Sequence, residues 1–157
     1  MDIDFMNSFH GQKAMKYFKE GYNCAQAVFL CYAEELGMEK SIALKLSSSF
    51  GGGMGRMREV CGAVTGMFMA AGLLYGYDSP TDRQAKAGHY KRIQELASYF
   101  KEETGSIICK ELLGLTGDQF SHVPEERTKT YYKKRPCVQN VGIAATILEN
   151  YIQEHQS

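Results

Sequence analysis

The chain has 157 residues, enough for one ordinary domain. Lysine and arginine number 18, and aspartate and glutamate also number 18, so the formal net charge is zero. This balance argues against a nucleic-acid partner held by a broad basic surface and against a polybasic membrane anchor. A hydrophobic fraction of 44% is typical of a globular chain, and five cysteines are too few for a disulfide-held mini-protein.

Neither the N-terminal segment nor the longest apolar stretch suggests export or membrane insertion. The N-terminal segment lacks a basic start followed by an apolar core and a cleavage site, so we expect no secretory signal. The longest apolar stretch, residues 63–75, is shorter than the roughly 20 residues that span a bilayer. We therefore expect a cytoplasmic protein, in which thiols are mostly kept reduced. There, several cysteines favour redox catalysis, metal binding or core packing over structural disulfides.

The first third of the chain shows three helical patterns in succession. Apolar residues recur at helical spacing over residues 5–18. Asn23 and Gln26 then form a capping-box pattern, which predicts a helix that is closed by Gly37. A third helix is predicted over residues 39–50.

A glycine-rich segment separates these helices from a buried one. Residues 51–60 contain four glycines and two arginines, and we expect them to take an unusual backbone path past Cys61. The following run predicts a buried helix in which Gly62, Gly66 and Ala70 fall four residues apart. Such a smooth stripe lets another helix approach closely, either within the chain or across a homodimer.

The next helix is predicted to start at a proline. Ser79 is its expected cap, with Pro80 in the first helical position, and the helix runs to residue 103. A shorter helix is predicted from Ser106, stopped by Gly114.

The last part of the chain predicts a loop and a closing helix. Residues 115–136 are polar and are expected to form a long loop, in which the basic segment 129–135 is a solvated stretch or binds an anion or a partner. An apolar side over residues 137–155 predicts the final helix. Since no alternating strand pattern or repeat occurs, we expect a single all-α domain over residues 1–157, a bundle of about six or seven helices.

Four of the five cysteines fall at predicted helix starts, namely Cys24, Cys61, Cys109 and Cys137. A helix N-terminus presents unpaired N–H groups and the positive end of the helix dipole, which stabilise a thiolate. The thiolate is both the nucleophile of disulfide exchange and the form that binds metals. Cys31 lies two turns after Cys24, about 10.5 Å away, too far for a disulfide, and is interpreted as a core residue. Position alone leaves inert packing as an equal alternative.

Cys61 has the strongest local case for reactivity. Arg56 and Arg58 precede it and can supply positive charge, although Glu59 partly offsets them. Gly62 follows it and is expected to leave its sulfur accessible.

The cysteine order resembles a known family. Cys24, the run Cys61–Gly66, Cys109 and Cys137 are similar in order and motif to the C-GCAxxG-C-C family. The resemblance covers roughly residues 15–150 and implies redox activity. Some members of that family are similar to the cysteine-bearing part of split-Soret cytochromes, and some carry selenocysteine at a cysteine position. Because the chain has no CxxCH motif, covalent haem is not expected.

Three functions remain open. The first is thiol–disulfide exchange or electron transfer, which would make the chain an oxidoreductase with a redox partner still to be identified. Cys24 with Cys61 and Cys109 with Cys137 are the preferred pairs, and an accessible thiol of low pKa is predicted. The second is a zinc or iron–sulfur site with the same four cysteines as ligands, although no CxxC pair is present. The third is a helical binding module with inert cysteines.

Overall fold

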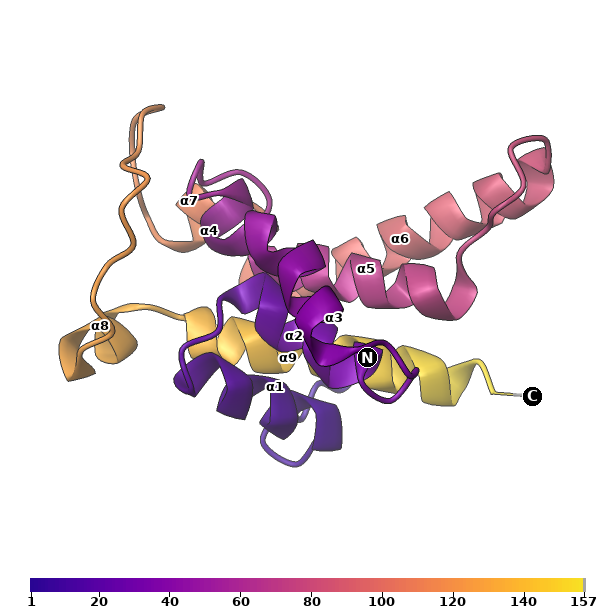
Figure 1. Cartoon of the computed structure of the whole chain (residues 1–157), viewed down its shortest axis with the longest axis horizontal. Coiled ribbons are helices and arrows are strands. Elements are labelled where there is room, and N and C mark those ends of the chain that lie inside the picture. The colour runs from indigo at the N-terminus through magenta and orange to yellow at the C-terminus, as the bar shows by residue number, and fades with distance from the viewer. Residues whose placement is uncertain (157) are drawn as a thin grey trace.

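The computed structural model describes residues 1–156 and is all-α, as predicted (Figure 1). Ser157, the last residue of the predicted domain, lies outside this range. Six helices have eight or more residues: α1 (Phe9–Lys19), α2 (Cys24–Ala33), α3 (Lys40–Ser47), α5 (Gly62–Tyr75), α6 (Arg83–Thr104) and α9 (Cys137–Glu154). Shorter segments complete the set: η1 (Ser48–Phe50), α4 (Gly51–Met54), α7 (Cys109–Leu112) and α8 (Lys129–Lys134). Within residues 1–156 there is no β-strand, and the only bridge joins Val60 to Ile108.

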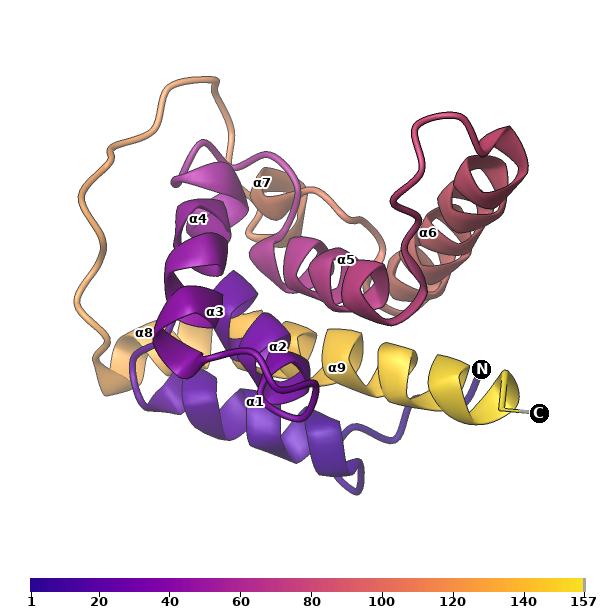
Figure 2. The ribbon, with the colours of Figure 1, turned by 45° about the vertical axis from the view of Figure 1, so that its right-hand side comes forward.

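The core is centred on α2. Eight of its ten residues are buried, and it packs against α1, α3, α5 and α9. Figure 2 shows α1 and α9 side by side, with α2 crossing them. Each large apolar side chain buried here, such as Phe29 or Leu30, contributes about 1.5–3 kcal/mol. Cys31 is fully buried in this core, as its position predicts.

The small-residue stripe of α5 faces α2. A Cβ atom on Gly66 would lie 2.7 Å from the carbonyl oxygen of Ala25, and one on Gly62 would collide with the sulfur of Cys24. Ala70, the third member, is fully buried. The stripe is therefore an internal helix contact, and it no longer supports a homodimer.

Helix α6 begins later than the proline suggests. Asp82 is the cap, and its Oδ1 accepts a hydrogen bond from the Ala85 N–H at 3.0 Å. The Ser79 hydroxyl instead accepts from the Thr81 N–H within the preceding turn. Because the aspartate cap satisfies a free N–H of the first turn, the helix starts at Arg83.

Backbone hydrogen bonds between distant segments make α7 begin later than the sequence predicts. The Cys109 N–H donates to the Glu59 carbonyl at 2.6 Å, and the Ser106 hydroxyl accepts from the Ile108 N–H. This pairing holds the backbone extended, so the helix begins at Cys109 and not after Ser106.

The predicted loop 115–136 contains a helix that the sequence analysis missed. Thr128 caps α8, its hydroxyl accepting from the Tyr131 N–H at 3.1 Å. The expected helix over residues 39–50 is also divided, into α3 and η1.

In residues 1–156 no helix is both long enough and apolar enough to cross a membrane.

Candidate functional site

The four predicted cysteines line one small cavity of about 70 Å³. Cys24, Cys109 and Cys137 are the first residues of α2, α7 and α9, and Cys61 is the residue that precedes α5. The predicted helix-start positions are thus confirmed. Four segments that are far apart in the chain bring their thiols together.

The start of α2 is fixed by a capping box. The Asn23 Oδ1 accepts from the Gln26 N–H at 2.9 Å, and the Gln26 Oε1 accepts from the Asn23 N–H at 3.0 Å. Gln26 also donates to the Leu44 carbonyl of α3 at 3.1 Å. A cap of this kind contributes about 1 kcal/mol. It holds Cys24 in the first helical position, facing the cavity.

Glycines bring the thiols close to neighbouring backbone. The Cys24 sulfur lies against Gly62, at the position a side chain would need, so it sits at the start of α5 beside Cys61. Gly53 has a left-handed φ of 74°, and a Cβ on it would lie 2.6 Å from that of Cys109. The glycine-rich segment therefore passes close to Cys109. The sequence had predicted that it would pass close to Cys61.

The two predicted arginines do not act on Cys61 together. The Arg58 guanidinium is buried and donates from Nη1 to the Cys109 sulfur at 3.6 Å. Arg56 lies outside the thiol cavity, with its Nη2 3.7 Å from Glu125 Oε1. Arg58 is therefore the arginine of the thiol site, and the sulfur that it contacts is Cys109.

Burial controls the protonation of Cys61. This residue is only 7% exposed, and burial raises the pKa of its thiol well above the ordinary value. The Cys24 thiol raises this pKa further, whereas the N–H groups of Ala63 and Val64 at the start of α5 lower it. The helix-start effect is present, but desolvation outweighs it. The expectation that Gly62 leaves the Cys61 sulfur accessible is therefore wrong, and burial makes Cys61 a poor candidate for the predicted thiol of low pKa.

Burial also raises the pKa values of the Cys109 and Cys137 thiols. Burial raises the pKa of Cys109, and the Arg58 guanidinium offsets part of the rise. Burial, Cys24 and Cys109 raise the pKa of Cys137 to about 12. Cys24 thus lies close enough to affect the pKa of each of the three other thiols, and it is itself half-buried.

The thiols do not form a ligand cluster. All five cysteines are free, and within residues 1–156 no three His, Cys, Asp or Glu side chains are placed to hold a metal ion. This geometry gives the zinc or iron–sulfur alternative no support, because such centres need ligands converging on one point.

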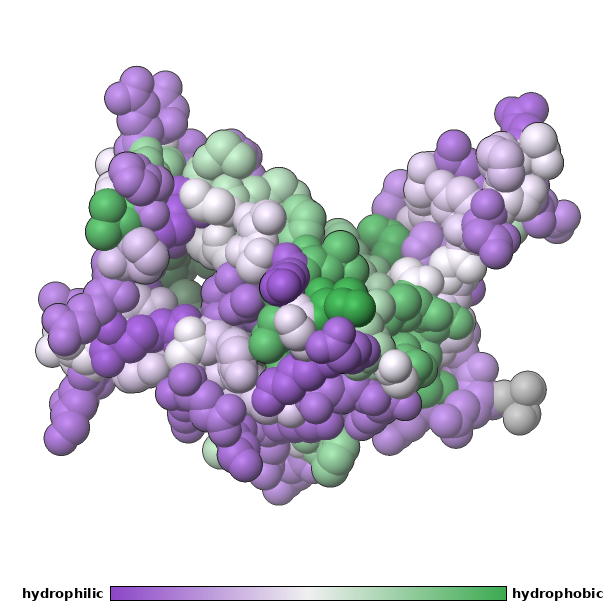
Figure 3. All heavy atoms as spheres, viewed as in Figure 1, coloured by the Kyte–Doolittle hydropathy of each residue, from purple (hydrophilic) through white to green (hydrophobic). Residues whose placement is uncertain are grey.

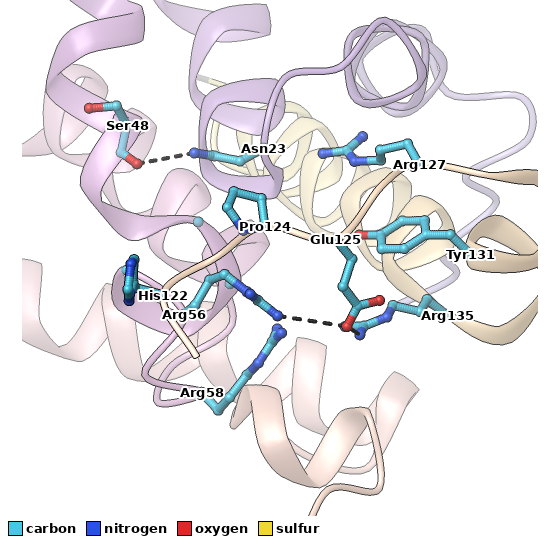
Figure 4. A pocket seen from close by; sticks show the side chains of 13 residues that line it. Asn23, Ser48, Arg56, Arg58, His122, Pro124, Glu125, Arg127, Tyr131 and Arg135 are labelled. Carbon is cyan, nitrogen blue, oxygen red and sulfur yellow. Dashed lines mark hydrogen bonds and ion pairs between the residues drawn. The ribbon is translucent and has the colours of Figure 1, made fainter. Parts of the chain in front are cut away.

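A second pocket, of about 270 Å³, adjoins the thiol cavity (Figure 4). Four arginines line it: Arg56, Arg58, Arg127 and Arg135. Arg58, Arg127 and Arg135 also line the thiol cavity, so the two spaces share a wall. Glu125 is the carboxylate in this pocket. We call it the arginine pocket.

The sequence analysis did not identify Arg127. Its Nη2 donates to the Tyr22 carbonyl at 2.9 Å, and its guanidinium lies 4.0 Å from the ring centre of Phe18. These contacts join the segment before α8 to α1 and the start of α2. Within the stretch 129–135, Tyr131 and Arg135 line the pocket, and Arg135 is its basic member there. No local pattern signals Arg127, because the backbone carbonyls that it binds, those of Phe18 and Tyr22, are more than a hundred residues away.

The chain is thus an all-α protein with four helix-start thiols gathered in one cavity. A family model described as "Putative redox-active protein (C_GCAxxG_C_C)" matches residues 22–151, which include all four site cysteines. The chain therefore belongs to this family, as its cysteine order predicts. Comparison with curated proteins found no match, and comparison with solved structures found none either.

Proposed function

We propose that the chain is a thiol–disulfide redox protein in which Cys24 is the reacting thiol and Cys61 its resolving partner. The observation that carries this proposal is the position of Cys24. Cys24 is the half-buried first residue of α2, and its sulfur contacts Gly62, the residue that follows Cys61. It also affects the pKa of every other thiol of the cavity. Cys109 and Cys137 form the second pair, next to the Arg58 charge.

The exchange proceeds in two steps. Cys24 releases its proton to solvent, and the thiolate attacks one sulfur of a substrate disulfide, whose other sulfur leaves and takes up a proton. The Cys61 sulfur then attacks Cys24 in the mixed disulfide, and its proton passes to the departing substrate thiolate, which leaves as the second substrate thiol. The substrate gains two electrons and two protons, and the protein dithiol becomes a disulfide. A cellular dithiol reductant reverses the change.

The buried thiols suit the resolving step. At neutral pH a thiol of raised pKa is protonated and unreactive toward bulk oxidants. Such a thiol reacts when a mixed disulfide forms beside it. We place the protein in the cytoplasm, where a dithiol of this kind is kept reduced between cycles. A homodimer remains a prediction that sedimentation can test.

The test is disulfide mapping after treatment with the neutral oxidant diamide. We expect a Cys24–Cys61 crosslink in the wild-type protein, its loss in Cys24→Ser, and its retention in the matched core variant Cys31→Ser. Peptide mass spectrometry reads the crosslink directly. Iron and zinc are measured on the same protein, purified without oxygen.

Two results would overturn the proposal. One is a Cys24→Ser protein that still forms the same amount of intramolecular disulfide. The other is a stoichiometric metal in the purified protein that disappears when any one of the four cysteines is replaced by serine.

A further inference from the structure

The arginine pocket carries a local excess of positive charge. Four arginines face one carboxylate, Glu125, although the whole chain is neutral. Arg127 is held by backbone carbonyls, which do not neutralise its charge. Burial and the nearby Arg58 charge lower the pKa of Arg56. Like charges held together in a partly buried place are costly unless an anion joins them.

Arg58 has a hydrogen-bond donor without a partner. The residue is 5% exposed, and its Nε is the buried side-chain nitrogen or oxygen that lacks a partner within residues 1–156. Figure 4 shows its side chain reaching into the pocket, with its end beside that of Arg56. A buried, charged donor left unpaired costs free energy, so it marks a place where a ligand can supply the missing acceptor.

Glu125 shows which acceptor fits. Its carboxylate bonds to Arg135 and lies 3.7 Å from Arg56. The glutamate belongs to the segment between α7 and α8, and its side chain is about half exposed. A planar guanidinium matches a carboxylate with two parallel hydrogen bonds. The carboxylate of a small ligand can therefore take the place of the Glu125 carboxylate.

We infer that the arginine pocket binds the carboxylate of a small disulfide or thiol substrate, with Glu125 as the internal group that this carboxylate displaces. Arg58 contacts the Cys109 sulfur on one side and lines the pocket on the other. A molecule anchored there by its carboxylate extends its remaining atoms toward the thiol cavity. Carboxylate binding stands on the pocket alone, whereas the link to a sulfur substrate rests on the proposed function.

Alkylation by two reagents of similar size tests the inference. Iodoacetate carries a carboxylate and iodoacetamide does not. With either, the Cys24 thiolate displaces iodide and a carbon–sulfur bond forms. We expect the Cys24 rate to saturate with iodoacetate and to stay linear with iodoacetamide. Acetate should compete with iodoacetate alone, and inorganic phosphate less well. Peptide mass spectrometry follows the labelled cysteine.

Variants assign the effect to the pocket. Arg58→Gln should raise the half-saturating iodoacetate concentration about tenfold or more, as expected for the loss of a charge-assisted hydrogen bond. Glu125→Gln should lower it, because the internal competitor is gone. Arg83→Gln, the same charge change at an exposed site at the start of α6, should leave it unchanged. Circular dichroism checks folding, and Arg135→Gln replaces Arg58→Gln if the latter fails to fold.

The outcomes separate this inference from the proposed function. Linear iodoacetate kinetics in the wild-type protein, or saturation that Arg58→Gln and Arg135→Gln both leave unchanged, overturns the pocket. Disulfide formation by diamide needs no carboxylate, so it can succeed in that case. Saturation that responds to the variants without any diamide crosslink supports carboxylate binding and overturns the redox cycle.

Discussion

Cys137 combines a helix start with a thiol that is hard to ionise. Burial raises its pKa to about 12, and Cys24 and Cys109 contribute, while Arg135 and Arg58 oppose the rise. An unfolded chain has a thiol pKa of about 8.5. Between these values the folded protein keeps a proton that the unfolded chain has lost. Raising the pH therefore favours unfolding.

The stability that Cys137 contributes should follow this window. Under reducing conditions it should be fully present below about pH 8.5 and should decline as the pH rises toward 12. The difference in melting temperature between the wild-type protein and Cys137→Ser should shrink correspondingly. Urea or thermal unfolding of both proteins from pH 7 to 11 measures it. A difference that stays constant across this range would contradict the raised pKa.

Between elements, the contact of α5 with α2 sets the geometry of the thiol cavity. Gly66→Ala should destabilise the fold by about 1–3 kcal/mol, because the new methyl would meet the Ala25 carbonyl. Gly72→Ala is the matched control on the same helix. Its methyl has open space, so it should stabilise by about 0.5–1 kcal/mol. Denaturant unfolding measures both, and equal effects of the two changes would refute the close contact.

The elements also show what a sequence can and cannot predict. The Asn23–Gln26 capping box is a local device, and the structure confirms it residue for residue. The start of α7 depends on the Cys109 N–H pairing with Glu59, fifty residues earlier, which no local pattern encodes. The helix-start positions of Cys24 and Cys61 are likewise visible in sequence. The desolvation that raises the pKa of Cys61 is not, because it exists only once distant helices have packed around the thiol.

Across the whole molecule, α6 is the long helix with the smallest share of buried residues, two of its 22. Figures 1 and 2 show its N-terminal end far from α9, and Figure 3 shows mainly hydrophilic side chains there. Its buried residues, Leu96 and Phe100, both lie in its second half. Helices hold their structure mainly through packing of an apolar face.

Hydrogen exchange should reveal this difference. Backbone amides of residues 83–91 should exchange much faster than those of α2, since local opening of the free end exposes little apolar surface. Exchange followed by mass spectrometry of peptides from both helices measures the ratio. Equal protection of both would mean that a further surface, for example a second copy of the chain, covers this end of α6.

The thiol cavity joins the beginning of the chain to its end, and this has a consequence for biosynthesis. Cys24 and Cys61 leave the ribosome well before α9, which supplies Cys137 and packs against α1. Until α9 docks, the cavity that Cys61 shares with Cys137 and Asn140 of α9 is incomplete, so part of the burial that raises the pKa of Cys61 in the folded protein is missing. A nascent chain is therefore more easily oxidised at Cys61 than the folded protein, because thiolates react with peroxides and thiols do not. Completing the fold protects the sulfurs that the fold brings together.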